Sequence, residues 1–178
     1  MPLRPALLAL CLAFAACAST GPRMVTDADN PHAVGTGSAV NVRWGDPNEF
    51  AELRYSQNRR IAVQGDWVVE LAEYMQKQVA KAVPAGERVD VEILDLQRAG
   101  QFEWMRTQND DVRVMRDVYP PRMTLQFKRT ASDGSVISEG ARQISDLAYL
   151  QGPSPFPSSD PLRYDKRMID TWIRREFK

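Results

Sequence analysis

The chain has 178 residues, of which 43% are hydrophobic and 26% are charged, a composition typical of one globular domain. Basic and acidic side chains balance at 23 each, so the overall charge gives no support to nucleic-acid binding. Both cysteines, Cys11 and Cys17, lie near the start of the chain. The remainder therefore carries neither a disulfide framework nor a thiolate metal site.

Residues 1–16 have the pattern of an export signal peptide. Arg4 supplies a positive charge, an apolar stretch follows, and small residues precede Cys17. The apolar stretch is shorter than the roughly 18 to 20 residues that a transmembrane helix needs. The segment Phe14-Ala15-Ala16-Cys17 resembles the bacterial lipobox, whose cysteine receives a lipid. We therefore expect the mature chain to begin at Cys17, anchored by acyl chains such as palmitate.

The residue after the cysteine bears on the location of such a lipoprotein. Ala18 is not Asp, which resembles the outer-membrane sorting signal of lipoproteins, so we expect an outer-membrane lipoprotein that faces the periplasm. Plain cleavage after an Ala-x-Ala motif such as Ala16-Cys17-Ala18, which would give a soluble periplasmic protein, and an uncleaved anchor are the alternatives. Residues 17–38 are polar and lack apolar periodicity, which predicts a flexible tether; an irregular packed arm is the alternative.

The folded part is predicted to begin with two strands separated by a helix. Residues 39–44 alternate between apolar and polar side chains, and so do residues 89–93, so both are expected to be half-buried strands. Asp66 is a candidate N-cap for an amphipathic helix that ends before Pro84. Residues 50–55 form either a short extended piece or a helical turn. Residues 97–111 are expected to be a polar connection.

The second half is predicted to contain more strands. Residues 112–118 alternate and end before two prolines, and residues 123–127 alternate again. Asp133-Gly134 predicts a hairpin turn, from which residues 135–144 return antiparallel. A proline-rich loop over 147–159 follows.

The last element is predicted to be a helix that is capped by Asp160, has Pro161 at its first position and carries one apolar face. We therefore expect residues 39–178 to form one α+β domain. Its sheet would be mixed or mainly antiparallel, with about four to five strands and two amphipathic helices on one face.

The sequence is poor in catalytic residues. His32 is the only histidine and lies in the predicted tether, so we expect no metal, no cofactor and no His-dependent catalysis in the domain. The acidic residues Asp110, Asp111 and Asp117 leave a carboxylate-dependent hydrolase open as an alternative. That alternative requires two of these carboxylates to converge in a cleft with a raised pKa.

Aromatic and basic residues on the connections are the candidate binding residues. Aromatic side chains on stiff loops can stack on sugars or hold a peptide, although large aromatics more often fold back onto a core. Charged residues there could line a groove or simply form a solvated face. The candidates are Phe102, Trp104, Arg113, Arg116, Phe156, Arg163 and Tyr164.

Three stretches, which begin at Asp95, Asp111 and Asp160, resemble the bacterial domain-of-unknown-function family 3016. They read DLQRAG, DVRVMRDVYPPR and DPLRYDKRMIDTW, and Asp165 stands where the family pattern suggests Glu. The resemblance implies an exported, single-domain protein and implies no activity, cofactor or catalytic residue.

The function expected from the sequence is therefore that of a non-enzymatic binding or accessory module. Its partner would be another envelope protein or a cell-wall polymer. Besides the hydrolase, a carrier of a small apolar ligand stays open as an alternative, and it would require an internal cavity of about 300 Å³ or more.

Overall fold

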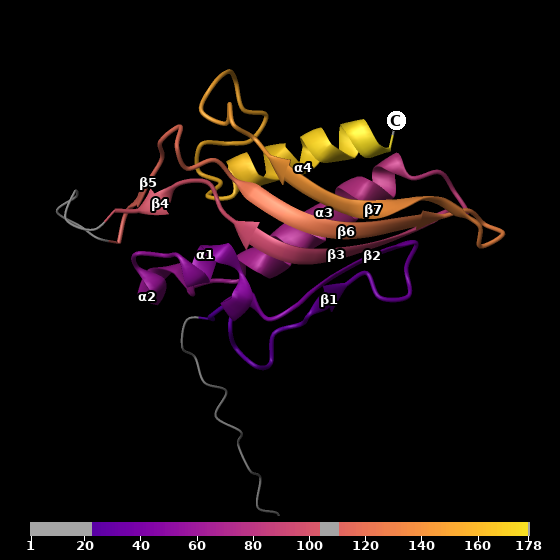
Figure 1. Cartoon of the computed structure of the whole chain (residues 1–178), viewed down its shortest axis with the longest axis horizontal. Helices are drawn as coiled ribbons and strands as arrows, with labels where there is room; N and C mark the ends of the chain where they lie inside the picture. Colours follow the sequence, from indigo (N-terminus) through magenta and orange to yellow (C-terminus); the bar gives the residue numbers. More distant parts are fainter. Residues whose placement is uncertain (1–22, 104–110, 178) are drawn as a thin grey trace, which may run out of the picture.

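The computed structural model describes residues 23–103 and 111–177. They form an α+β fold in which a five-stranded sheet is covered on one face by two long helices (Figure 1). The strand order is β1-β2-β3-β6-β7. The predicted fold class, a mixed sheet with both amphipathic helices on one face, is confirmed.

The sheet combines one parallel pair with antiparallel neighbours. β2 (Val40–Trp44) runs parallel to β3 (Arg88–Gln97). α3 (Trp67–Ala82) is the crossover helix between them, as a parallel pair requires. The remaining pairs are antiparallel and join β1 (Ala33–Val34) to β2, β3 to β6 (Arg122–Thr130), and β6 to β7 (Val136–Ser145).

The two long helices pack on each other and on the sheet. Tyr74 of α3 donates a hydrogen bond of 2.7 Å to Asp170 of α4 (Arg163–Glu176). Phe127 of β6 packs edge-to-face against Trp172, with ring centroids 6.1 Å apart.

Among the helices of residues 23–103 and 111–177, none combines the length and hydropathy needed to span a bilayer. Three short helices lie between β2 and α3: η1 (Pro47–Glu49), α1 (Ala51–Arg54) and α2 (Arg59–Ala62).

A β-bulge in β3 decides which of its side chains face away from the helices. Up to Ile93 the odd-numbered residues of β3 are buried in the core. Beyond the irregularity between Ile93 and Asp95, the buried residue is Leu96, and Leu94 is 48% exposed. The bulge therefore turns Asp95 and Gln97 to the open face of the sheet, the face that neither long helix covers.

The first described residues pack against the domain as an arm. Val25 is 3% exposed, and its backbone N–H donates to the carbonyl of Val63 at 2.8 Å. The N–H of Trp44 donates to the carbonyl of His32 at 3.0 Å, next to the β1–β2 pair. From residue 23 the chain therefore follows the alternative of a packed arm and not the flexible tether predicted for residues 17–38. Residues 17–22 lie outside the described residues.

The strand predicted over residues 112–118 is wrong in its extent. Only β5 (Arg113–Val114) is extended, and it pairs with β4 (Gln101–Phe102) in a small sheet of two strands. Val118 is 71% exposed. The alternating pattern overestimates the strand because no strand within residues 23–103 and 111–177 pairs with residues 115–118, which therefore join no ladder there.

The start of the last helix is also later than predicted. α4 begins at Arg163, with Leu162 as its N-cap residue. The Oδ1 atom of Asp160 accepts a hydrogen bond of 2.8 Å from the backbone N–H of Leu162, and Oδ2 pairs with Lys166 at 2.7 Å. Asp160 therefore stabilises the turn ahead of α4, where its carboxylate also binds a cation of the first helical turns.

Candidate functional site

The candidate site lies at the end of β3, where the short helix α1 joins the sheet. The Oδ1 atom of Asp95 accepts hydrogen bonds from the backbone N–H of Ala51 at 2.7 Å and of Leu96 at 2.8 Å. The first bond satisfies a helix N–H that has no partner within a helix of four residues. Asp95 therefore holds α1 against the sheet and so positions Glu52, the second residue of α1.

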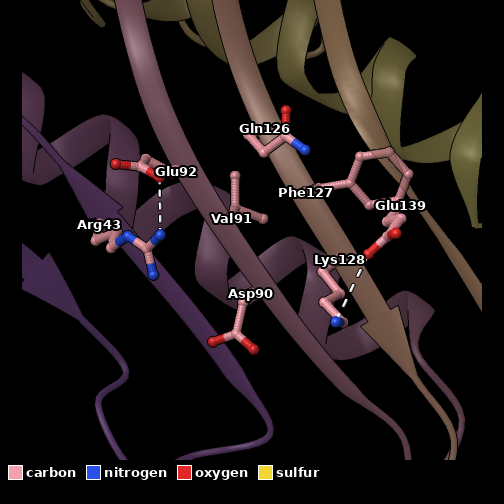
Figure 2. A pocket seen from close by; sticks show the side chains of 8 residues that line it. All are labelled: Arg43, Asp90, Val91, Glu92, Gln126, Phe127, Lys128 and Glu139. Carbon is pink, nitrogen blue, oxygen red and sulfur yellow. Dashed lines mark hydrogen bonds and ion pairs between the residues drawn. The ribbon is translucent and has the colours of Figure 1, made fainter. Parts of the chain in front are cut away.

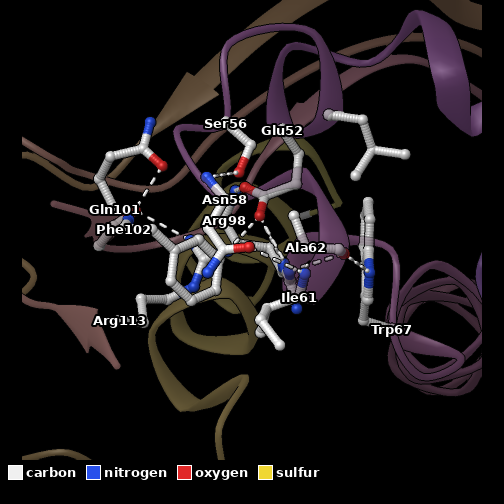
Figure 3. Close-up of polar contacts among 12 residues, drawn as sticks. Glu52, Ser56, Asn58, Ile61, Ala62, Trp67, Arg98, Gln101, Phe102 and Arg113 are labelled. Atoms are coloured by element: carbon white, nitrogen blue, oxygen red, sulfur yellow. Dashed lines mark hydrogen bonds and ion pairs between the residues drawn. The ribbon is translucent and has the colours of Figure 1, made fainter. Parts of the chain in front are cut away.

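Glu52 is the centre of a buried ionic cluster (Figure 3). Its carboxylate accepts hydrogen bonds from the backbone N–H of Arg98 at 3.0 Å and from the Arg98 guanidinium at 2.9 and 3.1 Å. The guanidinium of Arg113 donates to Oε1 of Glu52, the same oxygen that accepts both bonds from the Arg98 guanidinium. The side chain of Glu52 is 3% exposed, and those of the two arginines are 14% and 15% exposed. Two cations therefore bind one carboxylate almost out of contact with water, with one positive charge in excess.

Aromatic rings cover both arginines of this cluster. The guanidinium of Arg98 lies 4.4 Å from the ring centre of Trp67, and that of Arg113 lies 4.7 Å from the ring centre of Phe102. Such cation–π contacts suit arginine, which is more weakly hydrated than lysine. Burial lowers the pKa of Arg98, and the charge of Glu52 opposes that shift. The rings thus close the cluster off from solvent.

Asp165 lies at the helix end of the same cluster. It is 2% exposed, and its Oδ1 atom accepts a hydrogen bond of 3.1 Å from the backbone N–H of Ala99. Its Oδ2 atom is buried without a partner among the described residues. Burial raises the pKa of this carboxyl to about 7, and the Ala99 bond and the charges of Arg98 and Arg113 oppose that rise. Asp165 therefore keeps its proton to a higher pH than an exposed aspartate does, and it ties α4 to the end of β3.

A second group of polar contacts joins the neighbouring loops. Glu103, which is 8% exposed, accepts hydrogen bonds from Arg116 at 2.8 Å and from the hydroxyl of Tyr119 at 3.0 Å. The hydroxyl of Tyr149 donates to the carbonyl of Arg116 at 2.7 Å. The ring of Tyr149 meets that of Tyr164 edge-on, with centroids 4.9 Å apart. These bonds join the loop after β5, the loop after β7 and α4.

Most of the predicted binding residues contribute to this region. Phe102 is 4% exposed and packs under Arg113, so this aromatic folds back onto the core. The guanidinium of Arg163 lies 4.4 Å from the ring centre of Tyr164. Arg113, Arg116 and Tyr164 make the contacts described above. They form interlocking loop contacts at one end of the molecule, and the side chain of Arg116 is 44% exposed.

The remaining predicted residues are Phe156, Trp104 and Cys17. Phe156 is half-buried and packs edge-on against Tyr74 of α3, with ring centroids 5.8 Å apart. Phe156 is therefore separate from the ionic cluster and packs the proline-rich loop after β7 against α3. Trp104 and the predicted lipidation site Cys17 lie outside the described residues.

Sequence reasoning missed Glu52, the centre of the ionic cluster, and Tyr149, which joins the neighbouring loops. Glu52 stands in an apolar segment between Phe50 and Leu53, both of which are buried. A carboxylate within such a segment is a signal of a buried ion pair, because isolated charges are almost never buried. Tyr149, in the proline-rich stretch, gave no comparable signal.

The acidic residues proposed for a hydrolase do not converge in the described structure. Asp111 pairs with Arg60 at 2.5 Å on α2, and Asp117 is exposed in the loop after β5. Asp110 lies outside the described residues. Among residues 23–103 and 111–177, no three His, Cys, Asp or Glu side chains gather closely enough to hold a metal ion. Neither Asp111 nor Asp117 therefore shows the shared cleft that the hydrolase alternative requires.

The open face of the sheet is the second feature of functional interest. A shallow hollow of about 350 Å³ lies over its central strands (Figure 2). Arg43 pairs with Glu92 at 2.8 Å, and Lys128 pairs with Glu139 at 3.6 Å. Each pair joins neighbouring strands in register. This hollow is open and polar, unlike the enclosed apolar cavity that a carrier of an apolar ligand needs.

The fold and the cluster define a small α+β domain with one open sheet face and a buried arginine–carboxylate cluster at one end. The chain belongs to the family described as "Protein of unknown function (DUF3016)", whose model matches residues 38–175. No curated protein matches the chain. The three stretches that carry the resemblance meet in the cluster, to which they contribute Arg98, Arg113 and Asp165.

Proposed function

We propose that this protein is a lipid-anchored accessory module of the bacterial envelope that binds a partner and catalyses no reaction. The leader over residues 1–16 and the lipobox-like segment before Cys17 support the anchor. The anchor would hold the domain at the periplasmic face of the outer membrane. The partner would be another envelope protein or a cell-wall polymer.

One observation carries the binding role, namely that both long helices cover the same face of the sheet. The other face is left with exposed polar side chains of β3, β6 and β7 and with hollows large enough for part of a ligand. The buried ionic cluster supports this role indirectly. Glu52 and its two arginines are engaged with one another, so they hold the neighbouring segments in place and leave the open face as the contact surface.

The anchor is tested by Cys17→Ser in the full chain. The variant should move from the membrane fraction to the soluble fraction and lose palmitate labelling, whereas Cys11→Ser should change neither. Unchanged membrane association and labelling in Cys17→Ser would overturn the lipid assignment.

The binding role is tested by crosslinking the anchored protein in intact envelopes and purifying the products under denaturing conditions. We expect a discrete product that contains one envelope protein or wall fragments, reproduced between preparations. Recovery of the uncrosslinked chain alone, under conditions that crosslink a known envelope complex, would contradict the proposal.

A further inference from the structure

A second hollow lies on the open face, beside the β-bulge of β3. Its volume is about 340 Å³. The strand registers place two rows of polar residues across β3, β6 and β7 at this position. One row is Gln97, Arg122 and Ser145, and the other is Asp95, Thr124 and Gln143.

Arg122 has a different electrostatic setting from Arg43 and Lys128, the two cations of the first hollow. Arg43 and Lys128 each pair with a glutamate of the adjacent strand. Arg122 has no carboxylate within ion-pair distance and no side-chain hydrogen bond among the described residues. Its neighbours across the strands, Gln97 and Ser145, offer uncharged hydrogen-bonding groups. An unpaired guanidinium in a hollow, flanked by neutral donors, is suited to a carboxylate.

Asp95 gives the hollow a second kind of partner. Its Oδ1 atom is occupied by the N–H groups of Ala51 and Leu96, which fix the orientation of the carboxylate. No hydrogen bond to its Oδ2 atom is made within residues 23–103 and 111–177, and this atom is not buried. It can therefore accept a hydrogen bond from a ligand N–H. The hollow offers donors at Arg122 and an acceptor one row away.

We propose that this hollow binds the free carboxylate end of a peptide. Arg122 would hold the carboxylate through two parallel N–H···O bonds, with Thr124 and Ser145 as further donors, and Asp95 would accept the N–H of the terminal residue. A volume of about 340 Å³ fits one or two terminal residues and not a longer segment. The inference rests on the proposed binding role and names the chemistry of its ligand.

The test is an amide NMR titration of the full chain in detergent micelles with N-acetylglycine, which carries a carboxylate next to an amide N–H. N-acetylglycinamide is the control compound, because it keeps the shape and removes the charge. We expect saturable shifts, with a Kd of about millimolar, confined to the ends of β3, β6 and β7. The amide should cause no saturable shifts.

Variants locate the site. Arg122→Gln should weaken binding by about tenfold or more, because a charge-assisted pair is lost. Arg88→Gln, on the far end of β3 and outside the hollow, should bind as the natural chain does. Equal binding by Arg122→Gln, or no saturable shift in the natural chain, would overturn the inference. Either result would overturn only this inference, because the envelope crosslinking experiment tests the broader binding role independently.

Discussion

One carboxylate oxygen of Glu52 accepts hydrogen bonds from the guanidinium groups of both Arg98 and Arg113. The three residues come from α1, from the turn after β3 and from β5. A buried pair of this kind contributes little net stability compared with an apolar core, but removal of one partner leaves the others as uncompensated buried charges. Substitution of one residue of the cluster should therefore lower the stability of the fold strongly.

The first prediction concerns the stability of Glu52→Gln. Because two mostly buried arginines lose their counterion, the free energy of unfolding should fall by about 3 to 5 kcal/mol, measured by urea denaturation. Glu49→Gln is the matched control, because Glu49 is exposed on η1 and should change stability by less than about 0.5 kcal/mol. Similar losses in both variants would contradict the role of the cluster.

The second prediction concerns Asp165 and pH. Its folded-state pKa of about 7 lies above the value of about 3.9 for an unfolded aspartate, so between these values the folded chain holds more protons. The stabilisation from this proton is complete below about pH 4 and is lost as the pH rises to about 7, by up to about 4 kcal/mol.

Asp165→Asn tests this dependence, because asparagine keeps the oxygen that accepts the Ala99 N–H and cannot ionise. The variant should gain stability relative to the natural chain between pH 4 and pH 7, measured by denaturation across that range. Parallel stability profiles for the two proteins would show that Asp165 does not titrate in this window.

The third prediction compares two glycines with positive φ. Gly100 has φ of +76°, and an added Cβ would lie 2.9 Å from the carbonyl oxygen of Val114 and 2.6 Å from the sulfur of Met115. Gly134 has φ of +84° in an open turn, with nothing within 4 Å. Gly134→Ala should cost about 1 kcal/mol from backbone strain alone. Gly100→Ala should cost clearly more in thermal unfolding, and equal costs would contradict the packing described around Gly100.

The fourth prediction contrasts two ion pairs between neighbouring elements. Glu87 and Arg129 are 18% and 14% exposed and lie 2.5 Å apart, whereas Glu92 and Arg43 are 36% and 55% exposed. Because solvent screens exposed pairs, Glu92→Gln should change the free energy of unfolding by less than about 1 kcal/mol. Glu87→Gln should cost more, since it leaves a half-buried arginine unpaired. A larger loss of stability in Glu92→Gln than in Glu87→Gln would contradict the expectation that the more buried pair contributes more.

The sequence predicted the elements whose periodicity is local. Alternation over Val89, Val91 and Ile93 and the Asp133-Gly134 turn lead directly to β3 and to the β6–β7 hairpin. The bulge at Asp95 could not be read, because it depends on how β3 and β6 pair and not on either strand alone. It is this bulge that places Asp95 and Gln97 on the open face.

The ionic cluster could not be predicted from the sequence for a related reason. Arg98 and Arg113 were recognisable as cations, but their shared partner Glu52 is 46 and 61 residues away in the chain. Only the packing of α1 against the end of β3 brings the three together. Likewise, no periodic pattern indicated that Val25 is buried, because the backbone bond from its N–H to the carbonyl of Val63 joins segments far apart in the chain.

The most direct test of the central claim, a binding module that uses its open sheet face, is site-specific photocrosslinking in intact envelopes. A crosslinking residue at Gln126, exposed on the open face, should yield a discrete envelope product, whereas one at Lys77, exposed on α3, should not. The same product from both positions, or a product from Lys77 alone, would contradict the claim.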